Sequence, residues 1–139
     1  MGPLEEKSLN FAVRIVKLSK FLNNQKQYVL AQQIIKSGTS IGANIYESFQ
    51  AETKPDFIHK LGIAQKECSE TLFWLRLMEK SNLISKKGFD SLDSDCQEIM
   101  RLLVASIKTS KKNLDSTPKS KKWLLGPFIR NSFSIKTNL

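Results

Sequence analysis

Apolar residues recur at helical spacing along most of the chain, and short polar stretches separate the segments in which they do so. A period of 3.6 residues predicts helices rather than strands. The predicted helices span residues 4–22, 25–50, 55–81 and 90–112. Because the connections between them are short, neighbouring helices should run antiparallel. The sequence therefore predicts an all-α fold, an antiparallel up-down-up-down four-helix bundle.

The third predicted helix carries the clearest pattern. Its core positions alternate steps of four and three residues, which is the heptad seam of helices packed side by side. The seam consists of Phe57, Leu61, Ala64, Cys68, Thr71, Leu75 and Met78. Further apolar residues, among them Phe73 and Leu77, widen the apolar surface beyond this stripe. A helix with two apolar faces contacts more than one neighbour, which favours a subunit contact beside the bundle core.

The stretch from Ser37 to Ser48 contains glycines, hydroxyl residues and an asparagine, all of low helix propensity. Nevertheless Ile34, Ile41 and Ile45 keep helical spacing through it. A stripe of small residues lies beside them: Ser37, Ser40, Asn44 and Ser48. We interpret the stretch as a helix suited to close packing against a neighbour. The alternative is a loop between two helices.

Asn44 lies on this small-residue stripe and is therefore expected to be largely buried. A buried amide needs hydrogen-bond partners, because an unmet donor or acceptor costs roughly 1–3 kcal/mol. The candidates are backbone carbonyls of its own helix, a hydroxyl such as that of Ser40, or a carboxylate on a packed helix.

The helical pattern ends near Asn113, and a polar linker with a proline follows at residues 116–122. We expect residues 1–112 to form the bundle and residues 113–139 to form a basic tail that is flexible or ordered only against a partner.

The formal net charge of the chain is +9, with 22 Lys and Arg against 13 Asp and Glu. A basic balance favours a polyanionic partner such as nucleic acid, although a solvated lysine surface would give the same count. The densest basic run lies at the end of the fourth helix and in the linker, with Trp123 beside it for stacking on a base. The candidate nucleic-acid-binding residues are Arg14, Lys17, Lys108, Lys111, Lys112, Lys119, Lys121 and Lys122.

Few residues could carry a reaction. His59 is the only histidine, so a di-iron site of the kind found in helix bundles cannot be completed within one chain. Glu67 and Glu70 are a carboxylate pair, but we expect them to bind lysines, hydroxyls or another subunit. Cys68 and Cys96 lie on apolar stripes, offset by roughly 10 Å in the expected register, which is too far for a disulfide. We expect no catalytic residue, metal or cofactor.

The N-terminal residues are polar, and no apolar run approaches the roughly 18 residues of a membrane span. We therefore expect a cytoplasmic protein without a membrane contact, in which both cysteines stay reduced.

Three motifs in order carry a family likeness: residues 37–48 (SGTSIGANIYES), residues 56–61 (DFIHKL), and a third motif in two parts, 63–71 (IAQKECSET) and 74–77 (WLRL). Together they resemble the bacterial four-helix-bundle proteins encoded in intervening sequences of large-subunit ribosomal RNA genes. The resemblance covers roughly residues 9–112. It departs at Gly42, where many relatives have proline, and at Cys68 and Ser69, where they have alanine and arginine. Motif residues expected to be structural are Ser37, Ser40, Asn44, Glu47, Glu70 and Trp74.

The resemblance also implies kinship with the accessory variability proteins of diversity-generating retroelements. Those proteins assemble as pentameric barrels and bind nucleic acid and a reverse transcriptase. By this resemblance we expect a homo-oligomer, of which a pentamer is one form, that binds RNA or DNA through a basic surface and has no enzymatic activity. The alternative is an oligomeric scaffold for a protein partner such as a reverse transcriptase, in which the charge serves only solubility.

Overall fold

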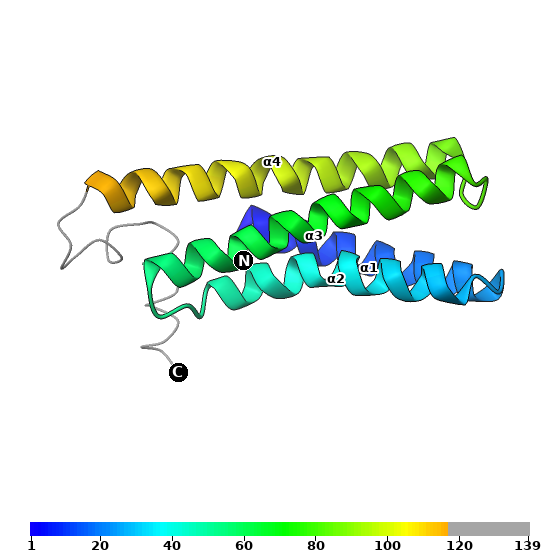
Figure 1. Ribbon diagram of the computed structural model, residues 1–139, viewed down its shortest axis with the longest axis horizontal. Helices are drawn as coiled ribbons and strands as arrows, with labels where there is room; N and C mark the ends of the chain where they lie inside the picture. The colour runs from blue at the N-terminus through cyan, green and yellow to red at the C-terminus, as the bar shows by residue number, and fades with distance from the viewer. Residues whose placement is uncertain (117–139) are drawn as a thin grey trace.

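The computed structural model describes residues 1–116, which form four helices and no strand within that range. They are α1 (Pro3–Asn24), α2 (Tyr28–Ser48), α3 (Lys54–Lys80) and α4 (Lys86–Ser116). Consecutive helices run in opposite directions and lie side by side, and α4 returns to pack against α1 (Figure 1). The all-α four-helix prediction is confirmed. The predicted tail lies outside the described residues, except that the fourth helix continues to Ser116 rather than ending at 112.

The order of contacts around the bundle is α1, α2, α3, α4 and back to α1. Helices α1 and α3 are therefore diagonal to each other, as are α2 and α4. The outward faces of two diagonal helices point to opposite sides of the molecule. Both α1 and α3 carry exposed apolar residues, so these residues lie on opposite sides of the bundle.

The predicted heptad seam of α3 is confirmed, since all seven of its residues are buried. The register predicted for α3 against α4 is wrong. The Cys96 thiol donates a weak hydrogen bond to the Cys68 carbonyl, with 3.7 Å between Sγ and O, so the two cysteines are neighbours. The error arises because the predicted helices end at 81 and begin at 90, which centres their turn near residues 85–86, whereas α3 ends at Lys80 and α4 begins at Lys86. Both cysteines are free thiols.

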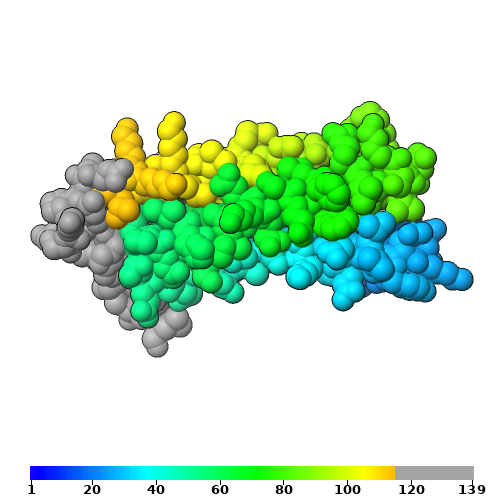
Figure 2. Space-filling model, viewed as in Figure 1, coloured from blue at the N-terminus to red at the C-terminus, as the bar shows by residue number. Residues whose placement is uncertain are grey.

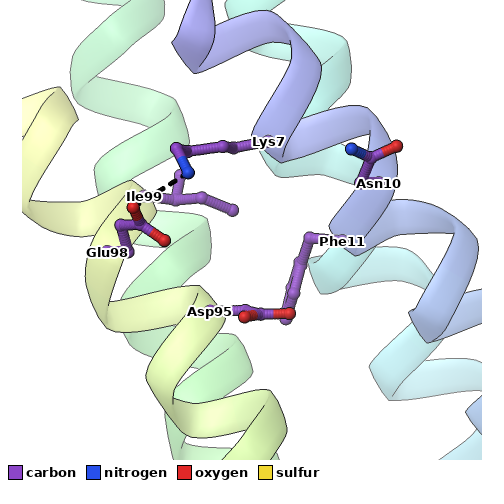
Figure 3. Close-up of a pocket in the computed structure, with 6 residues that line it drawn as sticks. All are labelled: Lys7, Asn10, Phe11, Asp95, Glu98 and Ile99. Atoms are coloured by element: carbon purple, nitrogen blue, oxygen red, sulfur yellow. Dashed lines mark ion pairs between the residues drawn. The ribbon is translucent and has the colours of Figure 1, made fainter.

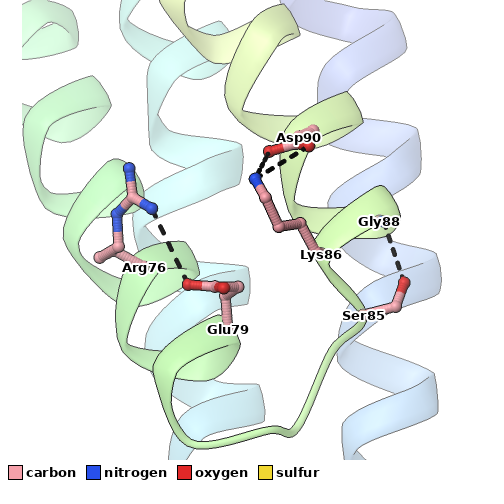
Figure 4. Close-up of polar contacts among 6 residues, drawn as sticks. All are labelled: Arg76, Glu79, Ser85, Lys86, Gly88 and Asp90. Carbon is pink, nitrogen blue, oxygen red and sulfur yellow. Dashed lines mark hydrogen bonds and ion pairs between the residues drawn. The ribbon is translucent and has the colours of Figure 1, made fainter.

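Helix α4 begins four residues earlier than predicted because Ser85 caps it. The Ser85 hydroxyl accepts a hydrogen bond from the Gly88 backbone N–H at 3.0 Å (Figure 4). A side-chain oxygen at this position satisfies one of the N–H groups that the first turn of a helix leaves without a partner. Phe89 in that first turn is buried and extends the apolar face of α4 toward the turn.

Helices α1 and α3 end with the same backbone motif. After α1, the Gln27 N–H bonds to the Leu22 carbonyl and the Lys26 N–H to that of Asn23; after α3, residues 83 and 82 repeat the pattern. The motif places one residue in the left-handed region, Lys26 with φ of 62° and Asn82 with φ of 59°. The first helix, predicted to end at residue 22, continues through Asn23 and Asn24.

The stretch from Ser37 to Ser48 is entirely helical, which confirms the interpretation of a close-packing helix. The residues that allow the close approach are Gly38 and Gly42, both buried against α1. A Cβ on Gly38 would lie 2.7 Å from Ile15 Cγ1, and one on Gly42 would lie 3.4 Å from Ser8 Oγ. The sequence pattern points to the serine and asparagine residues of the small-residue stripe as the packing surface. The close contact with α1 is instead made by the two glycines, which have no side chain.

Asn44 is half-buried rather than largely buried, so that expectation is corrected. It lies toward the edge of the stripe because Gly38, Ile41 and Gly42 occupy the buried face. Its Nδ2 donates to the Ser40 carbonyl at 2.8 Å, which is the first of the predicted kinds of partner. Ser40 is also half-buried, and its hydroxyl donates to the Lys36 carbonyl at 2.6 Å.

Candidate nucleic-acid interface

The charge of α4 is divided along its length. Its first half carries the acidic residues Asp90, Asp93, Asp95 and Glu98, and its second half carries the basic residues Arg101, Lys108, Lys111 and Lys112. All four basic side chains are exposed. None of them forms an ion pair with another side chain in the described range. They define the basic face of α4.

The second half of α4 extends past the start of α1. Lys7 of α1 pairs with Glu98 of α4 at 2.9 Å, so in antiparallel register Pro3 lies level with about Leu102. From there α4 continues to Ser116, roughly 20 Å further at 1.5 Å per residue. Figure 1 shows this overhang, and Figure 2 shows long side chains standing out from the same part of α4. Val104 within it is 45% exposed.

Arg14 does not belong to the basic face of α4. Its guanidinium forms an ion pair with Asp95 and donates to the Ser91 hydroxyl at 2.9 Å, which ties α1 to the acidic half of α4. Lys17, one turn further on, is exposed and forms no ion pair with a described residue. The remaining candidates, Lys119, Lys121 and Lys122, lie outside the described residues.

A pocket of about 190 Å³ separates α1 from α4 between these two ion pairs (Figure 3). It is lined by Lys7, Asn10, Phe11, Asp95, Glu98 and Ile99. Hydrogen bonding to Glu98 raises the pKa of Lys7 above its usual value, so the ammonium stays charged beside the carboxylate. Because each carboxylate of the pocket already faces a cation from α1, the arrangement links two helices and offers no free acid–base pair.

The glutamate pair and the cysteines, which were the other candidate reactive groups, also form no reactive site. Burial raises the pKa of Glu67, and the neighbouring Glu70 raises it further, while Lys36 opposes both effects. The contact with Cys68 and burial raise the pKa of the Cys96 thiol, which keeps it protonated and a poor nucleophile. No group of three His, Cys, Asp or Glu side chains within residues 1–116 could hold a metal ion.

Of the residues expected to be structural, some link two helices and others do not. Ser37 is buried and accepts a hydrogen bond from the Thr71 hydroxyl at 3.0 Å, across the α2–α3 seam. Glu47 pairs with Lys60 at 3.1 Å across the same seam. Trp74 stacks edge-on against Phe73, and its buried Nε1 has no acceptor among the described residues. Glu70 is exposed.

Two exposed apolar surfaces lie on the diagonal helices. On α1, Leu9, Val13 and Val16 are exposed at helical spacing, and Val13 is 48% exposed. Beside them a groove of about 230 Å³ runs between α1 and α2, lined by Leu9, Ala12, Thr39, Gly42, Ala43 and Tyr46. On α3, Phe73 is 58% and Leu77 is 37% exposed. The α3 surface is predicted from the sequence, where Phe73 and Leu77 form a second apolar face. The α1 surface is not predicted, although the helical spacing of Leu9, Val13 and Val16 is visible in the sequence.

Within residues 1–116, no helix has the length and apolar character needed to cross a bilayer. Comparison with protein families shows a match to the model of the 23S rRNA-intervening sequence protein over residues 4–105. No curated protein matches the chain. The family description indicates no enzyme class.

Among solved structures, the chain is similar to a protein of unknown function from the S23 ribosomal protein family of Bacteroides thetaiotaomicron. The two are 51% identical, the match covers 76% of this chain and 98% of the other, and the TM-score is 0.74. The family resemblance predicted from the three sequence motifs is thus confirmed. The chain belongs to the 23S rRNA-intervening sequence protein family.

Proposed function

We propose that this protein is a non-enzymatic homo-oligomer that binds nucleic acid through the basic face of α4. The observation that carries the proposal is the row of exposed cations on the second half of α4: Arg101 lies level with the first residues of α1, and Lys108, Lys111 and Lys112 lie on the overhang. No acidic residue occurs in the sequence from 99 to 114, so these charges act together on a polyanion. Phosphates are the natural partner of an exposed, unpaired row of cations.

The two apolar surfaces support the homo-oligomer. Valine, leucine and phenylalanine side chains exposed together mark protein contact sites more often than isolated surface residues do. Because α1 and α3 are diagonal, the Val13 surface of one copy and the Phe73 surface of the next can meet head to tail. Head-to-tail contacts close into rings when the rotation between copies allows it. A pentamer is one such ring, in keeping with the predicted kinship to the retroelement accessory proteins.

The second candidate is an oligomeric scaffold for a protein partner. The half-exposed Phe73 and the buried but unsatisfied indole N–H of Trp74 beside it favour a further protein contact on α3. A reverse transcriptase as that partner, and the cytoplasmic location, stay predictions from the sequence. In the scaffold alternative the basic face of α4 would contribute nothing to binding.

Replacing the four basic residues of the α4 face by glutamine is expected to raise the Kd for single-stranded RNA about 100-fold at 0.15 M salt. Glutamine keeps helix propensity close to that of lysine and arginine, so α4 should remain folded. The measurement is fluorescence anisotropy of a labelled oligouridine with the full chain. A Kd unchanged from that of the wild type would contradict the role of this face.

A further inference from the structure

The end of the bundle formed by the α1–α2 turn (25–27) and the α3–α4 turn (81–85) carries a second basic surface, which we call the turn end. Both turns lie at the same end of the molecule, on the right in Figure 1. The register between helices follows from contacts further along the bundle. Arg14 bonds to Ser91, which sets Lys17 level with Gly88. Ser37 bonds to Thr71, which sets Tyr28 level with Lys80.

Lysines from both helical hairpins are therefore brought together at the turn end. The exposed lysines without an ion pair among the described residues are Lys17, Lys20, Lys26, Lys80 and Lys87. The sequence from 17 to 28 contains no acidic residue. This surface is separated from the basic face of α4 by the length of the bundle, because α4 begins at one end and its overhang lies at the other (Figure 1).

Each of the two acidic residues at the turn end, Glu79 and Asp90, lies within ion-pair distance of a cation on its own helix. Glu79 lies 3.8 Å from Arg76, and Asp90 pairs with Lys86 at 3.1 Å (Figure 4). Neither carboxylate neutralises the lysines named above. The turn end thus presents an excess of positive charge to solvent.

One of these lysines occupies a position that suits glycine or asparagine better. Lys26 has φ of 62°, in the left-handed region where a side chain is disfavoured, and it is the middle residue of the α1–α2 turn. Asn82 fills the equivalent position after α3. The lysine adds a charge at the tip of the turn, where it contributes no packing to the core.

Two exposed aromatic side chains flank the same turn. Phe21 follows Lys20 and is 45% exposed, and Tyr28 opens α2 and is 61% exposed. Aromatic rings beside lysines are the combination by which proteins hold single strands, since bases stack on the rings while cations contact phosphates. An acidic protein would gain from the lysines but would have no use for the stacking surface.

We propose that the turn end binds single-stranded RNA, with Lys20, Lys26, Lys80 and Lys87 on the phosphates and Phe21 and Tyr28 on unpaired bases. Unpaired, splayed bases are the form in which RNA is most often recognised, which selects RNA over duplex DNA as the partner. The proposal deepens the nucleic-acid function proposed above, on which it rests, and assigns that function a second and separate surface.

The test compares two variants that remove the same charge from opposite ends of the bundle. The turn-end variant carries Lys20→Gln, Lys26→Gln, Lys80→Gln and Lys87→Gln. The α4 variant carries Arg101→Gln, Lys108→Gln, Lys111→Gln and Lys112→Gln. Both are measured in the full chain by anisotropy of a labelled oligouridine long enough to contact both ends of the bundle, with circular dichroism melting to verify folding. The turn-end variant is expected to raise the Kd about 100-fold at 0.15 M salt, because four cations no longer neutralise phosphates.

Stacking is tested with a further variant, Tyr28→Ala, in which the charge is unchanged. It is expected to raise the Kd for oligouridine about tenfold and to leave the weaker binding of duplex DNA unchanged. Poly-glutamate of equal charge should compete poorly with unlabelled oligouridine.

The outcomes separate this proposal from the function on which it rests. If only the α4 variant binds more weakly than the wild type, the turn-end proposal is overturned and the proposed function stands. If only the turn-end variant binds more weakly, the turn-end proposal stands and the α4 face is wrong. If the wild type binds no RNA, both fall. Equal competition by poly-glutamate, or duplex DNA bound as tightly as oligouridine, would also overturn the assignment to single-stranded RNA.

Discussion

Replacing Gly38 by alanine is expected to lower the free energy of unfolding by about 2 kcal/mol. The new Cβ would lie 2.7 Å from Ile15 Cγ1, closer than carbon atoms can pack. Ile15 is fully buried and cannot move aside without disturbing its own neighbours. Forcing an extra methyl group into a packed core costs roughly 1–3 kcal/mol, and the better helix propensity of alanine offsets at most about 1 kcal/mol of that.

Gly62 provides the matched control, because it also lies inside a helix but a Cβ there would meet nothing within 4 Å. Gly62→Ala is therefore expected to raise the free energy of unfolding by about 1 kcal/mol through helix propensity alone. Urea denaturation of both variants measures the two effects. If both variants shift stability in the same direction, the close approach of α1 and α2 at Gly38 is wrong.

Placing a charge on either apolar surface is expected to convert the proposed homo-oligomer to monomers. Val13→Glu disrupts the α1 surface and Phe73→Glu the α3 surface, because a carboxylate buried in an apolar interface loses its hydration without gaining a partner. Both side chains are about half exposed in the single chain, so the fold should survive either change. Light scattering gives the mass of each variant. Val104→Glu, at a similarly exposed valine of α4, should keep the oligomer and serves as the control.

Mixing the two disruptive variants tests the head-to-tail geometry. A Val13→Glu chain keeps its Phe73 surface, and a Phe73→Glu chain keeps its Val13 surface, so one intact interface can form between them. The mixture should contain dimers of one chain of each kind. If each variant alone is monomeric and the mixture also remains monomeric, the two surfaces do not contact each other.

Much of the fold was predictable because one physical signal, the burial of apolar residues at helical spacing, dominates the sequence. The seam from Phe57 to Met78 was identified residue by residue, and every member is buried. The order and spacing of three short motifs were specific enough to identify the family. All three motifs lie within residues 4–105, which the family model matches.

The helix ends were harder to predict because they depend on single hydrogen bonds. The cap of α4 depends on Ser85, a residue that fits equally well in a loop. The end of α1 depends on Lys26, whose left-handed conformation runs against its residue type. A few residues of error in the α3–α4 turn was enough to misplace Cys68 against Cys96, because in an antiparallel pair each residue of shift in the turn moves the facing partner by two.

The sequence predicts that the candidate interface is basic, but it does not predict which basic residues form it. The count of lysines and arginines shows an excess of positive charge but cannot show which of them are paired. Arg14 was a candidate in sequence and proves to be bound to Asp95, whereas Lys20, Lys26 and Lys80 were not candidates and are unpaired. The difference depends on which helices face each other, and that information lies in the tertiary register alone.

The most direct test of nucleic-acid binding is the salt dependence of the affinity of the full wild-type chain for oligouridine. Each phosphate contact to a single strand contributes about −0.7 to the slope of log K against log salt concentration. Four contacts from the basic face of α4 predict a slope of about −3, and an oligouridine long enough to contact the turn end as well predicts a slope of about −6. A slope near zero, or no binding at low salt, would contradict the account.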